Sequence, residues 1–156
     1  MPRNQIRLAT ALLLVGAGTL VAQRPNFSGN WVANLEQSNF GTLVSPKRYV
    51  RTIRQQDPYL TIATQLLETS GEKRGELRFT TDGEESDNEV AGLKVKGYAR
   101  RIGSHILIHT SRVQNGMEMT IDELWTLSAD GQALTIDAAV STPAGKQDLK
   151  VVFRKR

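Results

Sequence analysis

The feature that most constrains the fold is a period of two in the apolar residues, repeated in series along the chain. Apolar side chains take alternate positions in "LKVKGYA" (93–99), "MEMTI" (117–121) and "LTIDAAV" (134–140). Alternation of this kind gives each β-strand one apolar face. Between the turn signals, no segment keeps the 3.6-residue apolar period of a helix. The sequence therefore predicts an all-β fold.

Turn signals separate these segments at short intervals. Asn115-Gly116 and Asp130-Gly131 suit two-residue hairpins, because both central residues of such a turn need positive φ. Short sequential antiparallel strands form either a two-layer sandwich or a barrel, and closure into a barrel removes exposed strand edges. We expect an antiparallel up-and-down β-barrel of about eight to ten strands. The other turn signals are Asp57-Pro58, Gly71, Asp82-Gly83, Gly92, Gly103 and Gly145.

Residues 1–22 have the pattern of a signal peptide. Arg3 and Arg7 form a basic start, and the uncharged run Leu8–Ala22 is shorter than the roughly 20 apolar residues of a membrane span. The alternative is an anchored N-terminal helix. Cleavage after Ala22 would leave residues 23–156 as a single domain. We expect this domain to be exported, to the periplasm or the extracellular space.

Composition excludes several classes of function. The chain has no cysteine, which excludes disulfides, thiol chemistry and a lipid-modified N-terminal cysteine. Loss of Arg3 and Arg7 with the leader would lower the net charge from +4 to about +2. The densest basic run, "FRKR" (153–156), is interpreted as a solvated tail. We expect no nucleic-acid binding, which needs a focused basic patch.

Two groups of polar residues have side chains of the kinds that bind metal ions. His105 and His109 share one face of a strand but lie about 13 Å apart, too far to bind one zinc ion together. The apolar Ile106 and Ile108 indicate that both histidines face outward, with haem ligation by one of them as the alternative. The acidic run 82–89 lacks the spacing of an EF-hand and is interpreted as a solvated hairpin. No metal and no cofactor are predicted.

Motifs that would indicate catalysis are missing from the sequence. No glycine-rich phosphate loop leads from a strand into a helix, and no serine lies in a nucleophile-elbow pattern. The prediction is a protein that is not an enzyme.

The start of the expected domain resembles a known family. "FSGNW" (27–31) precedes the strand series, which ends in "LKVVFRKR" (149–156). Together they resemble the calycins, which include lipocalins and fatty-acid-binding proteins, and more closely small exported bacterial lipocalin-like proteins. Three features of the sequence differ from those of fatty-acid-binding proteins and avidins. The segment 42–47 is too short for the helical pair of fatty-acid-binding proteins, their C-terminal Arg-x-Tyr clamp is absent, and two tryptophans are too few for an avidin-like biotin site.

The opening motif is interpreted as structural. Gly29 would let neighbouring backbones approach where the barrel closes, and Trp31 would plug one end with its indole N–H bound to a carbonyl. The resemblance implies that a basic side chain of the last strand packs on Trp31. Arg154 is the candidate, and an exposed strand-end charge is the alternative. Residues 35–41 are expected to form one helical turn with Phe40 tucked into the barrel.

Two charged residues are placed ambiguously by the sequence. In "KRYVRTIRQ" (47–55), Arg51 faces inward if Tyr49 does, and an unpaired buried charge is costly. Its partner would be a bound carboxylate or an internal Glu123, unless the strand faces outward. In "MTIDELWTLS" (119–128), a bulge near Asp122–Glu123 is expected, with an inward-facing Glu123 as the alternative.

The resulting functional prediction is a barrel that binds an apolar or amphipathic small molecule in its interior. The alternatives are a barrel that binds a protein, such as an exported hydrolase, through its outer surface or loops, and a filled barrel without a ligand. The candidate wall residues of the cavity are Tyr49, Arg51, Phe79, Met117, Met119 and Trp125.

Overall fold

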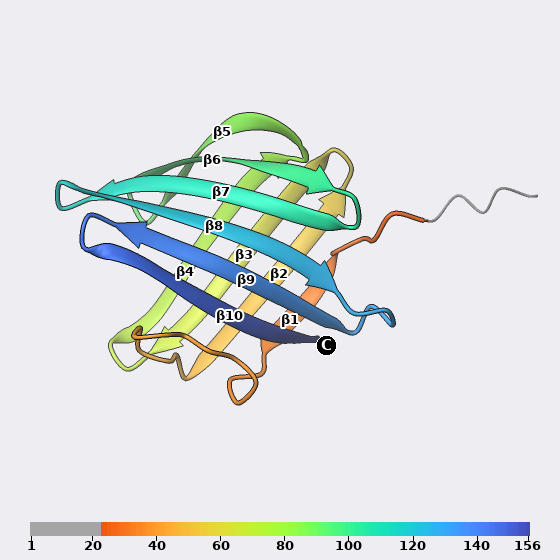
Figure 1. The fold of residues 1–156 in the computed structure, drawn as a ribbon, viewed down its shortest axis with the longest axis horizontal. Coiled ribbons are helices and arrows are strands. Elements are labelled where there is room, and N and C mark those ends of the chain that lie inside the picture. The colour runs from red at the N-terminus through yellow and green to blue at the C-terminus, as the bar shows by residue number, and fades with distance from the viewer. Residues whose placement is uncertain (1–22) are drawn as a thin grey trace, which may run out of the picture.

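The computed structural model describes residues 23–156, which form ten antiparallel strands (Figure 1). The expected signal peptide, residues 1–22, lies outside the described residues. Within 23–156 there is no helix long and apolar enough to cross a membrane. The strands are β1 (Gly29–Ala33), β2 (Arg48–Gln56), β3 (Tyr59–Glu68), β4 (Gly71–Thr80), β5 (Asp82–Val90), β6 (Leu93–Ile102), β7 (His105–Gln114), β8 (Met117–Leu127), β9 (Ala133–Thr142) and β10 (Gly145–Lys155).

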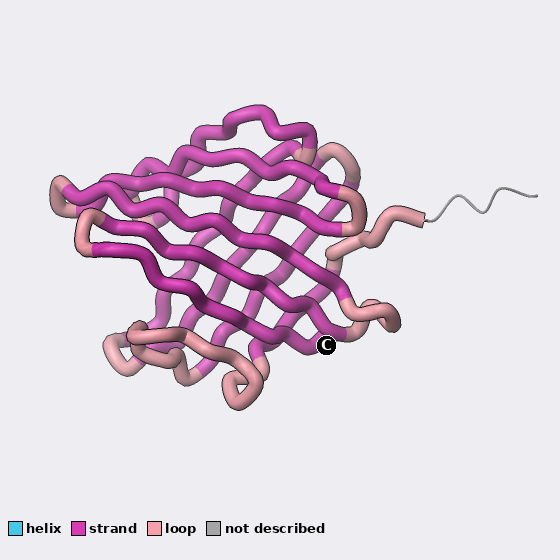
Figure 2. The backbone as a smooth tube through the Cα atoms, in the orientation of Figure 1, coloured by secondary structure: helices cyan, strands magenta, loops and turns pink. Residues whose placement is uncertain are grey.

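All ten strands belong to one sheet, in the order β4-β3-β2-β1-β10-β9-β8-β7-β6-β5. Consecutive strands are neighbours, and β1 pairs with both β2 and β10. In Figure 1, β1–β4 cross behind β6–β10 because the twisted sheet curls back on itself. The tube in Figure 2 shows that loops and turns lie at the ends of the strands. The expected up-and-down barrel is confirmed.

The barrel is not closed by a backbone hydrogen-bond ladder between β4 and β5, which are the two edge strands of the sheet. The side chain of Asn88 on β5 bridges this gap. Its Oδ1 accepts a hydrogen bond from the Arg78 backbone N–H at 2.8 Å, and its Nδ2 donates to the Arg78 carbonyl at 3.1 Å. One side-chain amide thus replaces a pair of ladder hydrogen bonds.

One end of the barrel is filled by a packed core. Inward positions alternate along the strands as expected, and the rings of Phe27 and Trp125 meet with their centroids 5.9 Å apart. The core therefore closes the end at which the chain enters β1. Its fully buried large side chains are Trp31, Trp125, Phe27, Phe153, Ile53, Leu60, Ile106, Leu134 and Ile136.

Strand β8 is regular where a bulge was expected. Asp122 and Glu123 pair in register with both β7 and β9, so the expected bulge is wrong and the alternative, an inward-facing Glu123, is right. Ordinary alternation carries Trp125 inward and leaves Leu124 37% exposed. The ladder is irregular on β5 instead, between Asp82 and Glu85.

Trp31 plugs the closed end as expected and is fully buried. Its Nε1 donates to the carbonyl oxygen of Phe27 at 2.9 Å. The basic residue packed on it is Lys155, whose Nζ lies 5.3 Å from the ring centroid, and the expected role of Arg154 is wrong. Lys155 is the cross-strand partner of Trp31, so both side chains share the inner face. Arg154 faces outward and donates to Gln37 Oε1 at 3.1 Å.

The reason for glycine at position 29 also differs from the expectation. A Cβ atom on Gly29 would lie 2.7 Å from Cε of Lys155, and its φ is +152°. The close approach therefore involves the lysine side chain that covers Trp31, not a neighbouring backbone.

The link between β1 and β2 contains a turn where a helical turn was expected. Ser38 N–H donates to the Leu35 carbonyl, and this short turn does not continue as a helix. Phe40 packs against the core cluster, as expected. The backbone of Asn39 forms an isolated bridge with Lys150 on β10, which ties the link to the barrel.

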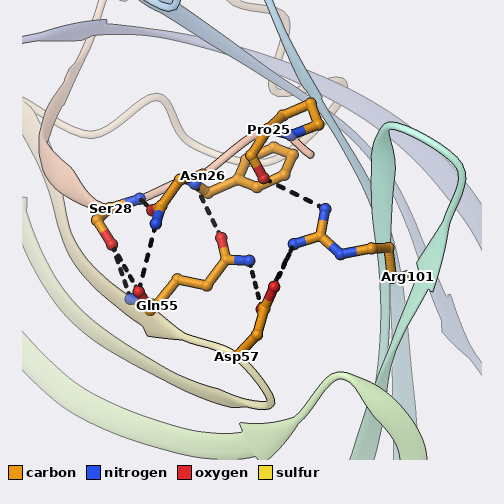
Figure 3. Close-up of polar contacts among 7 residues, drawn as sticks. Pro25, Asn26, Ser28, Gln55, Asp57 and Arg101 are labelled. Carbon is orange, nitrogen blue, oxygen red and sulfur yellow. Dashed lines mark hydrogen bonds and ion pairs between the residues drawn. The ribbon is translucent and has the colours of Figure 1, made fainter. Parts of the chain in front are cut away.

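The segment before β1 is fastened across the closed end (Figure 3). The buried side chain of Gln55 accepts a hydrogen bond from the Phe27 backbone N–H at 2.9 Å and donates to Asp57 Oδ1 at 2.7 Å. Arg101 donates to the Pro25 carbonyl at 3.2 Å and pairs with Asp57 at 3.4 Å. Residues 25–28 thereby seal this end of the barrel.

Candidate functional site

The half of the barrel opposite the packed core is hollow. A cavity of about 970 Å³ lies there, rimmed by the link 40–46 and by the β3–β4 and β9–β10 turns. A second hollow of about 650 Å³ extends toward the gap between β4 and β5 and shares the wall residues Tyr49, Arg51 and Glu123. The interior is therefore an open-mouthed cavity above a closed floor.

The floor of the cavity holds an ion pair between Arg51 and Glu123. Arg51 donates from Nη1 to Glu123 Oε2 and from Nη2 to Oε1, both at 2.7 Å. The two side chains are only 10% and 15% exposed. Because each carboxylate oxygen faces one nitrogen, the pair has the bidentate geometry that makes such contacts strong.

Aromatic rings enclose this pair. The guanidinium carbon of Arg51 lies 5.4 Å from the ring centroid of Tyr49, 5.6 Å from that of Trp125 and 6.0 Å from that of Phe153. Trp125 Nε1 also donates to Glu123 Oε2 at 2.7 Å. Cation–π attraction and this third hydrogen bond therefore help to offset the cost of burying the two charges.

The pair keeps both groups ionised. Burial by itself would raise the pKa of Glu123, but the charge of Arg51 and the hydrogen bonds from Arg51 and Trp125 hold it below its ordinary value. For Arg51, burial would lower the pKa, and the attraction of Glu123 raises it overall. Burial raises the pKa of Tyr49, so its hydroxyl stays protonated at neutral pH. The floor is therefore charged internally and neutral in sum.

This geometry decides among the three expected states of Arg51. The internal pair with Glu123 is present, so the outward-facing reading is wrong, and a ligand carboxylate is not needed as its partner. The sequence raised this pair as one option, because a buried arginine needs a counter-charge and an inward-facing Glu123 would supply it.

The six candidate wall residues divide into three groups. Tyr49, Arg51 and Met119 line the cavity. Phe79 and Trp125 are buried in the packed core and do not line either hollow. Met117, the first residue of β8, is 58% exposed and does not line either hollow.

Several wall residues went unrecognised in the sequence. Arg112, Ile121 and Ala138 line the cavity, each at an inward position of a strand whose alternation was already visible. Arg112 is charged, Ile121 is aliphatic and Ala138 is small, so side-chain type alone does not mark them as wall residues. The signal that identifies them is their position in the strand, counted from a buried neighbour such as Ile108.

The histidines lie on the outer face, as expected. His109 Nδ1 is 2.7 Å from Asp122 Oδ1, and its ring stacks on Tyr98 with centroids 5.3 Å apart. His105 Nδ1 is 3.0 Å from Thr126 Oγ1. In the part of the chain that the structure describes, no three His, Asp or Glu side chains gather in a group that could hold a metal ion.

Comparison with known proteins gives similarity at the level of structure. No protein-family model matches the sequence, and no curated protein matches it. A solved structure of zebrafish ileal bile acid-binding protein complexed with cholic acid is similar at 19% identity, over 83% of this chain and 98% of that chain, with a TM-score of 0.56. A Schistosoma mansoni fatty acid binding protein in complex with arachidonic acid is similar at 16% identity, over 83% and 96%, with a TM-score of 0.53.

A third similar structure is a secretory abundant heat soluble protein from Ramazzottius varieornatus, at 10% identity over 83% of this chain and 94% of that chain, with a TM-score of 0.58. Identities this low show a common fold. The resemblance noted for the opening motif is confirmed at that level. The chain has a calycin fold like that of fatty-acid-binding proteins, and its residues 23–156 form a ten-stranded antiparallel barrel.

Proposed function

We propose that this protein binds an apolar or amphipathic small molecule inside its barrel and carries it without chemical change. The observation that supports the proposal is the open cavity of about 970 Å³. Pockets for small molecules occupy about 300–1,000 Å³ and are mostly apolar with a few polar groups. The wall fits this description, since Ile121, Ala138 and Val140 line it above the paired charges of the floor.

The similar structures support this proposal. The zebrafish protein is complexed with cholic acid and the Schistosoma mansoni protein with arachidonic acid, both amphipathic molecules. In this chain the floor carboxylate of Glu123 accepts three hydrogen bonds and is held ionised, which makes it a poor proton donor or acceptor. A carrier role therefore fits the interior better than a catalytic one.

Fluorescence titration with the neutral dye Nile red tests the proposal. We expect saturable binding to the wild-type protein, and a loss of affinity of about tenfold or more in Ala138→Trp, because the indole would fill the cavity. Ala139→Trp is the matched control, since the next residue of β9 faces outward, and its affinity should be unchanged. Equal affinity in the two variants would place the dye outside the cavity.

We also propose that the carrier acts outside the cytoplasm. The support is the leader-like pattern of residues 1–22. Mass spectrometry of protein recovered from the exported fraction of its own cells should give a chain that begins at Gln23. A cytoplasmic chain that keeps Met1 or Pro2 would contradict this part of the proposal. Native spectra of the same sample would reveal any ligand that co-purifies.

A further inference from the structure

Arg112 is a basic residue inside the barrel with no established role. It lies on β7 on the same face as the buried Ile108, opposite Met119 of β8, and it lines both hollows. β7 ends only two residues later, at Gln114, so Arg112 lies near the mouth of the cavity and far from the packed core.

The guanidinium of Arg112 lacks a counter-charge. Its Nε is buried without a hydrogen-bond partner, and its Nη2 faces Met119 Sδ at 3.6 Å, a weak acceptor. An arginine side chain stays protonated, and a buried polar group without a partner is costly. Arg112 thus presents a positive charge and free donor capacity to the cavity.

The other charges of the wall are already neutralised. Among residues 23–156, Arg112 is the one basic residue lining either hollow that has no carboxylate within 4.0 Å. Arg51 also has an unpartnered Nε, but its charge is compensated by Glu123. The pairs that occupy the remaining charged wall residues are Arg51–Glu123, Lys73–Glu68, Arg74–Glu72 and Lys146–Asp148.

We propose that Arg112 binds the anionic head group of an amphipathic ligand at the mouth of the cavity, with the apolar tail directed inward toward the floor. The inference rests on the proposed function and adds the charge and the orientation of the ligand. A carboxylate or a sulfate accepts two N–H bonds from one guanidinium, which would satisfy the buried Nε. The apolar wall formed by Ile121, Ala138 and Val151 then contacts the tail.

The floor does not offer a competing anion site. Both terminal nitrogens of Arg51 are engaged by Glu123, and the nearby carboxylate would repel a second anion. A head group placed there would also leave Arg112 without a partner. The charges of the cavity therefore favour a ligand whose head lies at the mouth.

Displacement of Nile red by twelve-carbon probes tests the role of Arg112. We expect dodecanoate and dodecyl sulfate to bind more tightly than the neutral dodecanol, and Arg112→Gln to weaken both anions by about tenfold or more while leaving dodecanol unchanged. The control is Lys94→Gln, which removes a positive charge from an exposed position on the adjacent strand β6. This variant should keep the preference for anions.

The outcomes separate this inference from the proposed function. Equal affinity of the wild-type protein for dodecanoate and dodecanol, or an anion preference that survives in Arg112→Gln, would overturn the role of Arg112 and leave the carrier proposal standing. Failure of Nile red and all three probes to bind would overturn both. If Arg112→Gln does not fold, Arg112→Lys gives the answer, because it keeps the charge and should keep a weaker preference for anions.

Tryptophan fluorescence tests the orientation. The sequence has two tryptophans, and both Trp31 and Trp125 lie in the packed core at the closed end. A bromine atom quenches the indole more strongly the closer it lies. We therefore expect 12-bromododecanoate to quench more than 2-bromododecanoate at equal saturation. Stronger quenching by the 2-bromo compound would mean that the head group lies at the floor, which contradicts the proposed orientation.

Discussion

At the scale of single residues, Arg51 and Glu123 place two opposite charges inside a barrel that could have been closed with apolar side chains. The pair is held by two hydrogen bonds of 2.7 Å and by Trp125 Nε1. Buried ion pairs contribute little net stability compared with apolar packing, but breaking one leaves an uncompensated charge. This asymmetry gives a test of the pair.

We expect Arg51→Met to lower the free energy of unfolding by about 3–5 kcal/mol, because Glu123 would stay buried without its partner. The double variant with Glu123→Gln should recover most of this loss, since glutamine is neutral and can still accept from Trp125 Nε1. Urea unfolding at pH 7 measures both. Lys73→Met, which breaks an exposed pair with Glu68, is the control and should have a much smaller effect. Additive losses in the double variant would mean that the pair is not coupled.

The pH dependence of stability follows from the lowered pKa of Glu123. A carboxyl group whose pKa is lower in the folded state contributes stability that is fully present above its unfolded pKa, about 4.3 for glutamate. This contribution is lost as the pH falls through the folded value. We therefore expect the difference in unfolding free energy between wild type and Glu123→Gln to become smaller as the pH is lowered from 5. A difference that stays constant over that interval would contradict the assignment.

Sequence patterns placed the interior residues only where the strand face was unambiguous. Trp31 was expected at the plug because its size and position allow little else, and it lies there. The resemblance pointed to Arg154, with an exposed strand-end charge as the alternative, but the alternation from Phe153 carries Lys155 inward instead. The direction of the Glu123 side chain was undecided, because the two residues after it, Leu124 and Trp125, are both apolar. At an apolar pair, alternation gives no local sign of which residue is buried.

At the scale of strands, the sheet has one weak seam, between β4 and β5. Backbone ladders join β4 to β3 and β5 to β6, whereas here the Asn88 side chain makes two hydrogen bonds to Arg78. Gly75 contributes to the same seam, because a Cβ there would lie 2.6 Å from Cγ1 of Val90. The second hollow extends to this seam.

We expect Asn88→Ala to loosen the seam without unfolding the barrel. Loss of two hydrogen bonds should lower the free energy of unfolding by about 1–3 kcal/mol. The local sign is faster hydrogen exchange of the Arg78 amide, whose acceptor is the Asn88 side chain. Glu89→Ala, an exposed substitution on the same strand, is the control and should leave that amide unchanged. An unchanged exchange rate in Asn88→Ala would mean that other contacts hold the seam.

The number and order of the strands were accessible from the sequence because alternation and hairpin turns are local signals. The seam was not, because its cause is a side-chain contact between Asn88 and a backbone ten positions earlier in the chain. The attachment of residues 25–28 across the closed end was equally inaccessible from the sequence. Gln55 and Arg101 bind the segment 25–28 through contacts that no short motif encodes.

At the scale of the whole molecule, the barrel divides into a packed half and a hollow half with the Arg51–Glu123 pair between them. The packed half contains Phe27, Trp31 and Trp125 and is sealed by the segment before β1 (Figure 3). The hollow half carries the mouth and Arg112. Stability and ligand binding should therefore depend on different residues.

Two substitutions test this separation. Phe27→Ala should lower the free energy of unfolding by about 3–5 kcal/mol, because it leaves a void beneath Trp125 in a fully buried core. Its affinity for Nile red should nevertheless match the wild type, since Phe27 does not line either hollow. Ala138→Trp should show the reverse, with lost dye binding and stability close to that of the wild type. Urea unfolding and dye titration on the same samples measure both quantities, and a Phe27→Ala protein that is folded yet unable to bind the dye would show that the packed end shapes the cavity after all.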